Sequence, residues 1–169
     1  MAQAYKPLPA AADLWECFEY KPLTGQLIWR DVRRKKVVPG SAAGCTTAFG
    51  YKSLCFKRVN YQLHRVIWVW VTSKDPGEYQ VDHIDGDPAN NSWGNLRLAT
   101  HPENIRNRSV RKDNKLQVKG VFMRHDGKYR ARVRHNKVIY NLGVFNTAEQ
   151  AGAAYKKAAA ELQGEFFKV

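Results

Sequence analysis

The chain has 169 residues, of which 44% are hydrophobic, so it can build one mid-sized or two small packed domains, and a disordered chain is excluded as the default. Its 28 Lys and Arg residues outnumber its 15 Asp and Glu residues by 13, an excess that points to a polyanionic partner, either nucleic acid or an acidic membrane. The longest apolar run, Val66 to Val71, is far shorter than the roughly 20 residues of a membrane-spanning helix. The first residues show no secretion signal, so we expect a cytoplasmic protein without a membrane partner.

The three cysteines, Cys17, Cys45 and Cys55, are odd in number and widely spaced. No Cys-x-x-Cys pair is present to hold zinc or to support redox chemistry. We therefore expect reduced cysteines that pack in the interior, and any metal site would use ligands other than thiolates.

The first hundred residues predict short strands followed by a helix. Strand patterns cover Gln26–Trp29 and Tyr51–Phe56, and turns rich in Gly, Ala and Ser separate them. A helix is expected from Tyr61 to Val71, with Trp68 and Trp70 in the core.

The densest cluster of reactive side chains lies between Val81 and Asn107. Asp82 and His83 end a short strand, a loop rich in Asp, Asn and Gly follows, and a second strand covers Leu96–Ala99. Thr100 and Glu103 then form a capping box that begins a helix containing Asn104. This strand, loop, strand and helix would enclose a notch of the size of a metal ion.

Such a notch suits phosphodiester hydrolysis, which needs a hard cation at the phosphate and a base that deprotonates water. The oxygens of Asp82 and Asn104 suit Mg²⁺, which prefers oxygen ligands and keeps several waters. His83 can act as the base because the ordinary pKa of histidine lies near neutrality. The same dipeptides also occur in ordinary loops, so the fixed spacing of several matches carries the hypothesis.

The spacing resembles that of the HNH (ββα-metal) nucleases, specifically the phage and intron homing endonucleases in which Asn commonly replaces the final His. The matching motifs are Asp82-His83-Ile84-Asp85-Gly86, Asn90-Asn91, Asn95-Leu96-Arg97, Thr100 and Glu103-Asn104. Leu63-His64-Arg65 and Gly25 to Trp29 also resemble the N-terminal half of such proteins, and the resemblance covers roughly residues 13 to 108.

The resemblance implies that Asp82 and Asn104 bind one Mg²⁺ or Mn²⁺ ion and that His83 is the general base. It also implies that Asn95 pins the loop and orients His83, although a turn-closing asparagine explains this residue equally well. Arg97 would either contact the phosphate or brace the fold.

Two further histidines have less specific interpretations. His101 could approach the site but fits an exposed residue of a first helical turn better. His64 lies in an apolar stretch and is expected to be a hydrogen-bonded core histidine.

The last third of the chain predicts a different unit. The polar segment from Arg106 to Lys119 has six basic residues against one acid, and it would be a linker along a phosphate backbone or a plain solvated connector. Strands are expected at Gly120–Met123, Lys128–Arg134 and Val138–Phe145, and a helix follows the cap at Thr147. Strict alternation places three arginines on one face of the middle strand, Arg130, Arg132 and Arg134.

This unit resembles the APETALA-type (ethylene-response-factor) DNA-binding domain. The motifs that match are Lys119-Gly120-Val121, Gly127 to Ala131, Leu142 to Phe145 and Thr147 to Ala151. The resemblance implies a three-stranded sheet in the major groove, with the three arginines and Arg124 on bases or phosphates. Ile139 and Asn141 stand where that family has tryptophans, so its base preference does not transfer, and a merely solvated arginine face is the alternative.

The resulting hypothesis is an α+β protein with three parts. An HNH domain spans residues 1–108, a basic linker spans 109–118, and an antiparallel three-stranded sheet on one helix spans 119–169. We expect a site-specific homing DNA endonuclease that acts as a monomer on double-stranded DNA without a small-molecule cofactor, in the cytoplasm of a bacterial host if a phage encodes it. The alternatives are a DNA-binding protein with an inactive nuclease fold and an RNA-binding protein.

Overall fold

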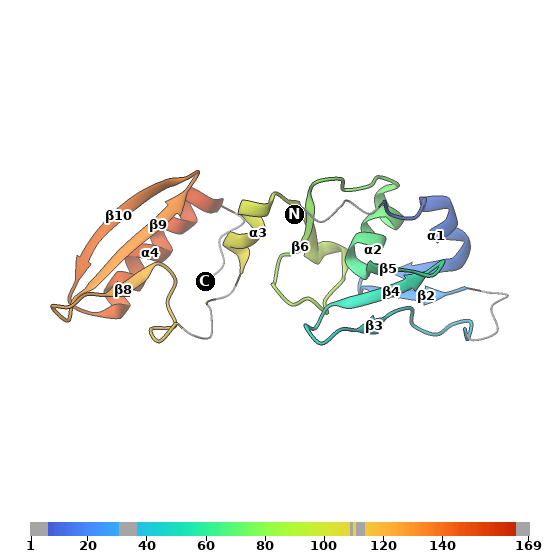
Figure 1. Cartoon of the computed structure of the whole chain (residues 1–169), viewed down its shortest axis with the longest axis horizontal. Helices are drawn as coiled ribbons and strands as arrows, with labels where there is room; N and C mark the ends of the chain where they lie inside the picture. The colour runs from blue at the N-terminus through green and yellow to red at the C-terminus, as the bar shows by residue number, and fades with distance from the viewer. Residues whose placement is uncertain (1–6, 31–36, 109, 111–113, 165–169) are drawn as a thin grey trace. The chain divides into compact units, whose positions relative to one another are not determined.

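The computed structural model describes residues 7–30, 37–108, 110 and 114–164, which form a mixture of helices and strands (Figure 1). This mixture agrees with the predicted α+β class. The chain divides into two compact units, Met1–Pro102 (unit 1) and Glu103–Val169 (unit 2). The predicted linker from 109 to 118 includes positions 109 and 111–113, which lie outside the described residues, so its role stays a prediction. None of the described helices combines the length and apolar composition that a membrane crossing requires.

Unit 1 contains short strands around one longer helix. The first sheet is the antiparallel hairpin of β1 (Phe18–Lys21) and β2 (Gln26–Trp29), and α1 (Ala11–Cys17) precedes it. The second sheet has the antiparallel order β3 (Cys45–Thr46), β4 (Lys52–Phe56) and β5 (Val59–Gln62). Helix α2 (Leu63–Thr72) follows the second sheet. The next two strands, β6 (Gln80–His83) and β7 (Leu96–Ala99), form an antiparallel hairpin, and the 3-10 turn η1 (Trp93–Asn95) lies between them. Helix α3 (His101–Asn107) comes last and crosses the unit boundary.

The core of unit 1 is aromatic and aliphatic. Phe18 is fully buried, and its ring centroid lies 4.3 Å from that of Trp29 and 5.4 Å from that of Phe56. Leu14 from α1 and Ile67 from α2 are also fully buried in the same cluster. This cluster packs the first two sheets against α2, and Val81 of β6 belongs to the same cluster.

The sequence located the longer elements of unit 1 better than the short ones. The helix expected at 61–71 begins only at Leu63, because Tyr61 and Gln62 pair with Leu54 and Ser53 in the sheet and end β5. The strand expected from Tyr51 begins at Lys52. The elements α1, β1, β3 and β5 were missed, since segments of two to seven residues show little periodicity of their own.

Unit 2 contains the antiparallel sheet β10-β9-β8, formed by β8 (Val121–Met123), β9 (Tyr129–His135) and β10 (Val138–Phe145). Helix α4 (Ala148–Gln163) packs against all three strands, and the Thr147 side chain accepts a hydrogen bond from the Gln150 amide at its start. On β9, Ala131 and Val133 are buried. Because successive side chains of a strand point to opposite faces, the alternate side chains of β9 lie on the open face of the sheet.

Gly120 explains how the chain enters this sheet. Its backbone has a φ of +66°, and a Cβ atom there would lie 2.3 Å from the Tyr155 ring and 2.5 Å from the Arg132 carbonyl oxygen. Only glycine accepts both the backbone conformation and this close approach of α4 and β9.

His64 is a buried polar residue in the apolar helix α2. Its side chain is 4% exposed, as expected for a core histidine, but its Nδ1 atom has no hydrogen-bond partner among the described residues, contrary to the expected hydrogen-bonded state. Burial lowers the pKa of His64 to about 3, and the nearby charges of His83 and Arg65 act in the same direction. His64 is therefore neutral over the whole physiological range of pH.

We expect acid to destabilise unit 1 through His64. In the unfolded chain this histidine binds a proton below pH 6.5, whereas in the folded chain it stays neutral down to about pH 3. Lowering the pH from 7 to 5 should therefore cost about 2 kcal/mol of folding free energy, and His64→Leu should remove most of this loss. Urea unfolding of both proteins at the two pH values measures it, with the exposed His101→Leu as the control. An unchanged pH dependence in His64→Leu would contradict the assignment.

Candidate functional site

Asp82 and His83 are the last two residues of β6, and both are buried, with exposures of 6% and 5%. The antiparallel register of the hairpin sets Asp82 opposite Arg97 and His83 opposite Leu96. Two adjacent ionisable side chains at a strand end are thus held in a defined place by backbone pairing.

Asp82 forms a buried ion pair with Arg97. The Nε and Nη2 atoms of Arg97 each lie 3.1 Å from Oδ2 of Asp82, and the Arg97 side chain is only 11% exposed. Removing either member of this buried pair would leave the charge of the other uncompensated. Of the two roles expected for Arg97, the structure shows the internal one, and its contact with DNA stays a prediction.

Asn95 closes the loop that follows His83. Its Nδ2 atom donates to Oδ1 of Asp85 and to the carbonyl oxygen of Asn90, both at 2.8 Å, and its Oδ1 atom accepts from the Asp85 amide at 2.9 Å. Its carbonyl oxygen accepts from the Ile84 amide at 2.9 Å. Asn95 thus ties both ends of the loop together, and its role in orienting His83 stays a prediction.

Asp85 is the acceptor at the centre of this loop. Its partial burial would raise the pKa of the carboxyl group, but hydrogen bonds from the Asp87 amide and from the side chains of Asn95 and Asn90 outweigh burial and lower the pKa. The ionised carboxylate is therefore the form that holds the loop.

The side chain of Asn91 contacts the imidazole of His83. Its Oδ1 atom lies 2.9 Å from Nε2 of His83, and the residue is 1% exposed. Nδ2 of Asn91 donates to the Ala89 carbonyl oxygen at 3.4 Å, which fixes which end of the amide faces the ring. Because Oδ1 only accepts, Nε2 carries the proton in the neutral ring and Nδ1 carries the lone pair.

Sequence reasoning did not give Asn91 this role. The Asn90-Asn91 pair is one of the motifs that resemble the family, but both side chains could equally close a turn. The folded loop distinguishes their roles. Asn90 forms hydrogen bonds with Asp85 and Ser92, whereas the side chain of Asn91 points inward and contacts His83.

Two aromatic side chains complete the surroundings of His83. The ring of His64 lies edge-on to it at a centroid distance of 5.0 Å and an angle of 74°, and the ring of Tyr51 lies at 6.1 Å. Tyr51 is 40% exposed, so it forms the part of this wall that solvent reaches. The imidazole therefore lies between a buried interior and an open surface.

The other predicted ligand, Asn104, is half-buried on α3 in unit 2, whereas Asp82 belongs to unit 1. Their pairing around one ion stays a prediction. His101 is exposed, as expected, and its Nδ1 atom lies 3.2 Å from Nε2 of Gln80.

The two predicted ligands are of donor types that suit a hard metal ion. Within the described ranges, no three His, Cys, Asp or Glu side chains gather as a closed metal cage would require. The buried carboxylate of Asp82 and the amide oxygen of Asn104 are the donor types that Mg²⁺ accepts while it keeps several waters.

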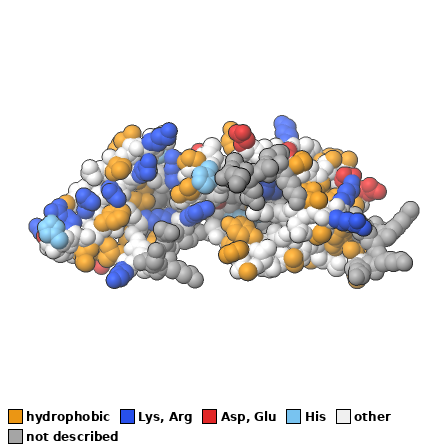
Figure 2. Space-filling view, viewed as in Figure 1, with side chains coloured by type: hydrophobic (Ala, Val, Ile, Leu, Met, Phe, Trp, Pro, Cys, Tyr) orange, Lys and Arg blue, Asp and Glu red, His pale blue; other side chains and the backbone are white. Residues whose placement is uncertain are grey.

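In unit 2, the alternation on β9 is as the sequence predicts. Arg130 and Arg134 are exposed and Arg132 is half-buried, on the side of the strand opposite the buried Ala131 and Val133. Figure 2 shows Lys and Arg side chains over the visible surface of this unit. Arg124 is tied to Asp126 by an ion pair of 3.3 Å at the β8–β9 turn.

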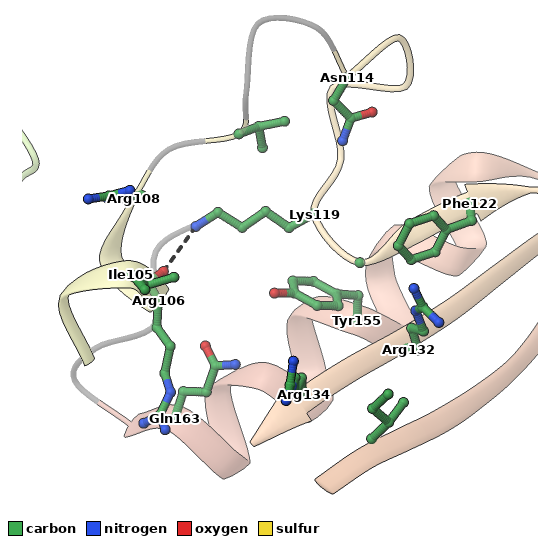
Figure 3. A pocket seen from close by; sticks show the side chains of 13 residues that line it. Ile105, Arg106, Arg108, Asn114, Lys119, Phe122, Arg132, Arg134, Tyr155 and Gln163 are labelled. Atoms are coloured by element: carbon green, nitrogen blue, oxygen red, sulfur yellow. Dashed lines mark hydrogen bonds between the residues drawn. The ribbon is translucent and has the colours of Figure 1, made fainter. Parts of the chain in front are cut away.

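A cavity of about 680 Å³ adjoins this face, and Figure 3 shows the side chains that line it. Five of its lining residues are cationic and none is acidic; they are Arg106, Arg108, Lys119, Arg132 and Arg134. Phe122 and Tyr155 add aromatic surface, and the Arg132 guanidinium lies 4.4 Å from the Phe122 ring centroid. Positive charge beside aromatic rings is typical of surfaces that bind nucleic acid.

Comparison with known proteins bears on unit 1. Residues 61–106 match the family model for HNH endonuclease. An uncharacterized HNH endonuclease of Acanthamoeba polyphaga mimivirus is 39% identical over 106 residues, which cover 62% of this chain and 54% of that protein. Protein 3.8 of Escherichia phage T7 is 40% identical over 58 residues, which cover 34% of this chain and 48% of that protein.

The chain thus spans about half the length of these relatives, and no solved structure matches it. The matched segment contains the strand end with Asp82 and His83, the loop closed by Asn95, and Asn104 on α3. Residues 61–106 therefore carry an HNH endonuclease domain.

Proposed function

We propose that this protein is a site-specific DNA endonuclease of the homing type, in which the HNH domain hydrolyses a phosphodiester bond and unit 2 places it on the target. The observation that carries the proposal is the arrangement of His83. Its imidazole is held by Asn91 in the tautomer with a basic Nδ1, directly after the buried carboxylate of Asp82, inside the segment that matches the HNH model.

His83 is the proposed general base. Nδ1 takes a proton from the water that attacks the phosphorus, and the ring becomes an imidazolium. The side-chain oxygen of Asn91 accepts from Nε2 in both states of the ring, so it keeps the orientation through the proton transfer. The loop closed by Asn95 prevents the strand end from moving away.

Asp82 and Asn104 are the proposed ligands of one Mg²⁺ or Mn²⁺ ion. Such an ion, when bound, would neutralise charge on the phosphate and stabilise the leaving oxygen. Arg97 keeps the Asp82 carboxylate in place through its contacts with Oδ2. The resemblance to the family implies products with 5′-phosphate and 3′-hydroxyl ends.

Unit 2 is the proposed reader of the target, in the manner of an APETALA-type domain. The open face of β9 with its arginines and the adjoining cationic cavity support this role. The side chains opposite Arg134 and Arg132 on β10 are Ile139 and Asn141, which offer an apolar contact and an amide to base edges. Competition between duplex DNA and structured RNA distinguishes this proposal from RNA binding.

His83→Ala should abolish the reaction. Removal of a general base costs about 10²–10⁴-fold in rate. Supercoiled plasmid, incubated with each protein in Mg²⁺ or in EDTA, should be nicked only by the wild type with metal. Equal nicking by both proteins would contradict the proposal, and tight, salt-sensitive binding without cleavage in any divalent metal would favour a binding protein with an inactive nuclease fold.

Asn91→Ala should lower the rate constant of cleavage by about tenfold to a hundredfold, as is typical when a residue that orients a reacting histidine is lost. DNA affinity should stay unchanged, because Asn91 is buried. Single-turnover cleavage and gel-shift titration measure the two quantities. Asn60→Ala, at an exposed position of β5, is the matched control. A wild-type rate in Asn91→Ala would exclude the positioning role.

The double variant Arg130→Ala/Arg134→Ala should weaken DNA binding and reduce the slope of log K against log salt by about 2, one for each lost phosphate contact. Lys156→Ala/Lys157→Ala removes the same charge from exposed positions of α4 and is the control. Binding isotherms at several salt concentrations give both slopes. Equal losses in the two variants would show a general effect of net charge instead of binding by the β9 face.

A further inference from the structure

Phe49 is an unusually exposed aromatic residue. Its side chain is 85% exposed, and no other described aromatic side chain is exposed to this degree. It lies in the turn between β3 and β4, away from the core that takes up Phe18 and Phe56. An aromatic ring so far exposed can reach a partner bound at this surface, and its position beside the candidate site gives this exposure its interest.

Backbone hydrogen bonds define the turn that carries Phe49. The Thr47 amide donates to the Tyr51 carbonyl oxygen at 2.7 Å, and the Gly50 amide donates to the Thr47 carbonyl oxygen at 3.0 Å. Gly50 has a φ of +82°, a backbone conformation that few other residues adopt. These constraints hold the Phe49 side chain away from the core.

The turn also lies beside the proposed catalytic centre. A Cβ atom on Gly50 would lie 3.1 Å from Cγ of Pro88, in the loop that follows His83. Tyr51, two residues after Phe49, has its ring 6.1 Å from that of His83. In Figure 1 the β3–β4 turn and the loop between β6 and β7 lie at the same end of unit 1.

Duplex DNA presents phosphates, sugars and stacked bases to such a residue. A phenyl ring gains little from phosphates, whereas it can replace a base as a stacking partner. Exposed apolar side chains that insert between base pairs kink the duplex and open the groove at that point. A hydrogen-bonded turn that carries one exposed aromatic ring and lies beside the loop that follows His83 is suited to this.

We propose that Phe49 is a wedge that inserts its ring between two base pairs beside the scissile bond. The unstacked step bends the duplex and exposes the phosphodiester to His83. This inference rests on the proposed nuclease function, because the partner must be duplex DNA bound at the site of His83.

The test uses the full chain with His83→Ala, which keeps the DNA uncut. Duplexes carry 2-aminopurine at each position flanking the bond that the wild type cuts, as mapped by sequencing its products. Fluorescence should rise at one step on binding, and Phe49→Ala should abolish the rise without loss of binding. Phe49→Leu should retain part of it, and Val38→Ala, at an exposed apolar position outside the turn, should retain all of it.

A second readout is the rate of cleavage. Phe49→Ala, in the chain with His83 intact, should cut the matched duplex slowly, and a mismatch at the wedge step should restore the rate because that step is already unstacked. A fluorescence rise that persists in Phe49→Ala, or a defect that the mismatch does not rescue, would overturn the proposal. Failure of the nuclease proposal is separate, since it appears as equal plasmid nicking by wild type and His83→Ala.

Discussion

The hydrogen-bonded loop after His83 is the constraint on which the candidate site depends. Strand pairing places the imidazole, but only the loop supplies the oxygen that fixes its tautomer, through Asn91. Asn95 holds that loop by three side-chain hydrogen bonds, and the ionised Asp85 is the centre of the network. Orientation of the His83 imidazole therefore comes from a few short polar contacts rather than from the hydrophobic core.

Each polar residue of the site makes a different contact. Arg97 balances the charge of Asp82, Asn95 closes the loop, and Asn91 orients His83. His64, neutral because of its burial, adds an uncharged neighbour that does not compete with His83 for a proton.

The sequence singles out candidate site residues, but it does not give the contacts among them. Asp82, His83 and Asn95 were identified because their spacing follows a pattern, and the strict alternation of β9 gave the open face of its arginines. Sequence spacing does not predict two contacts, that of Asn91 with His83 and that of Arg97 with Asp82. Both depend on the direction in which a side chain points in the folded chain. The turn with Phe49 was also missed, since it lies between strands too short to show a period.

The ion pair between Arg97 and Asp82 also affects the stability of the folded chain. Small domains built around zinc are unfolded without their ion because the free energy of metal binding supplies much of their free energy of folding. Here a guanidinium from the neighbouring strand already neutralises the buried carboxylate. The buried carboxylate therefore has its counter-charge within the fold, so the stability of this hairpin does not require an added cation to compensate Asp82.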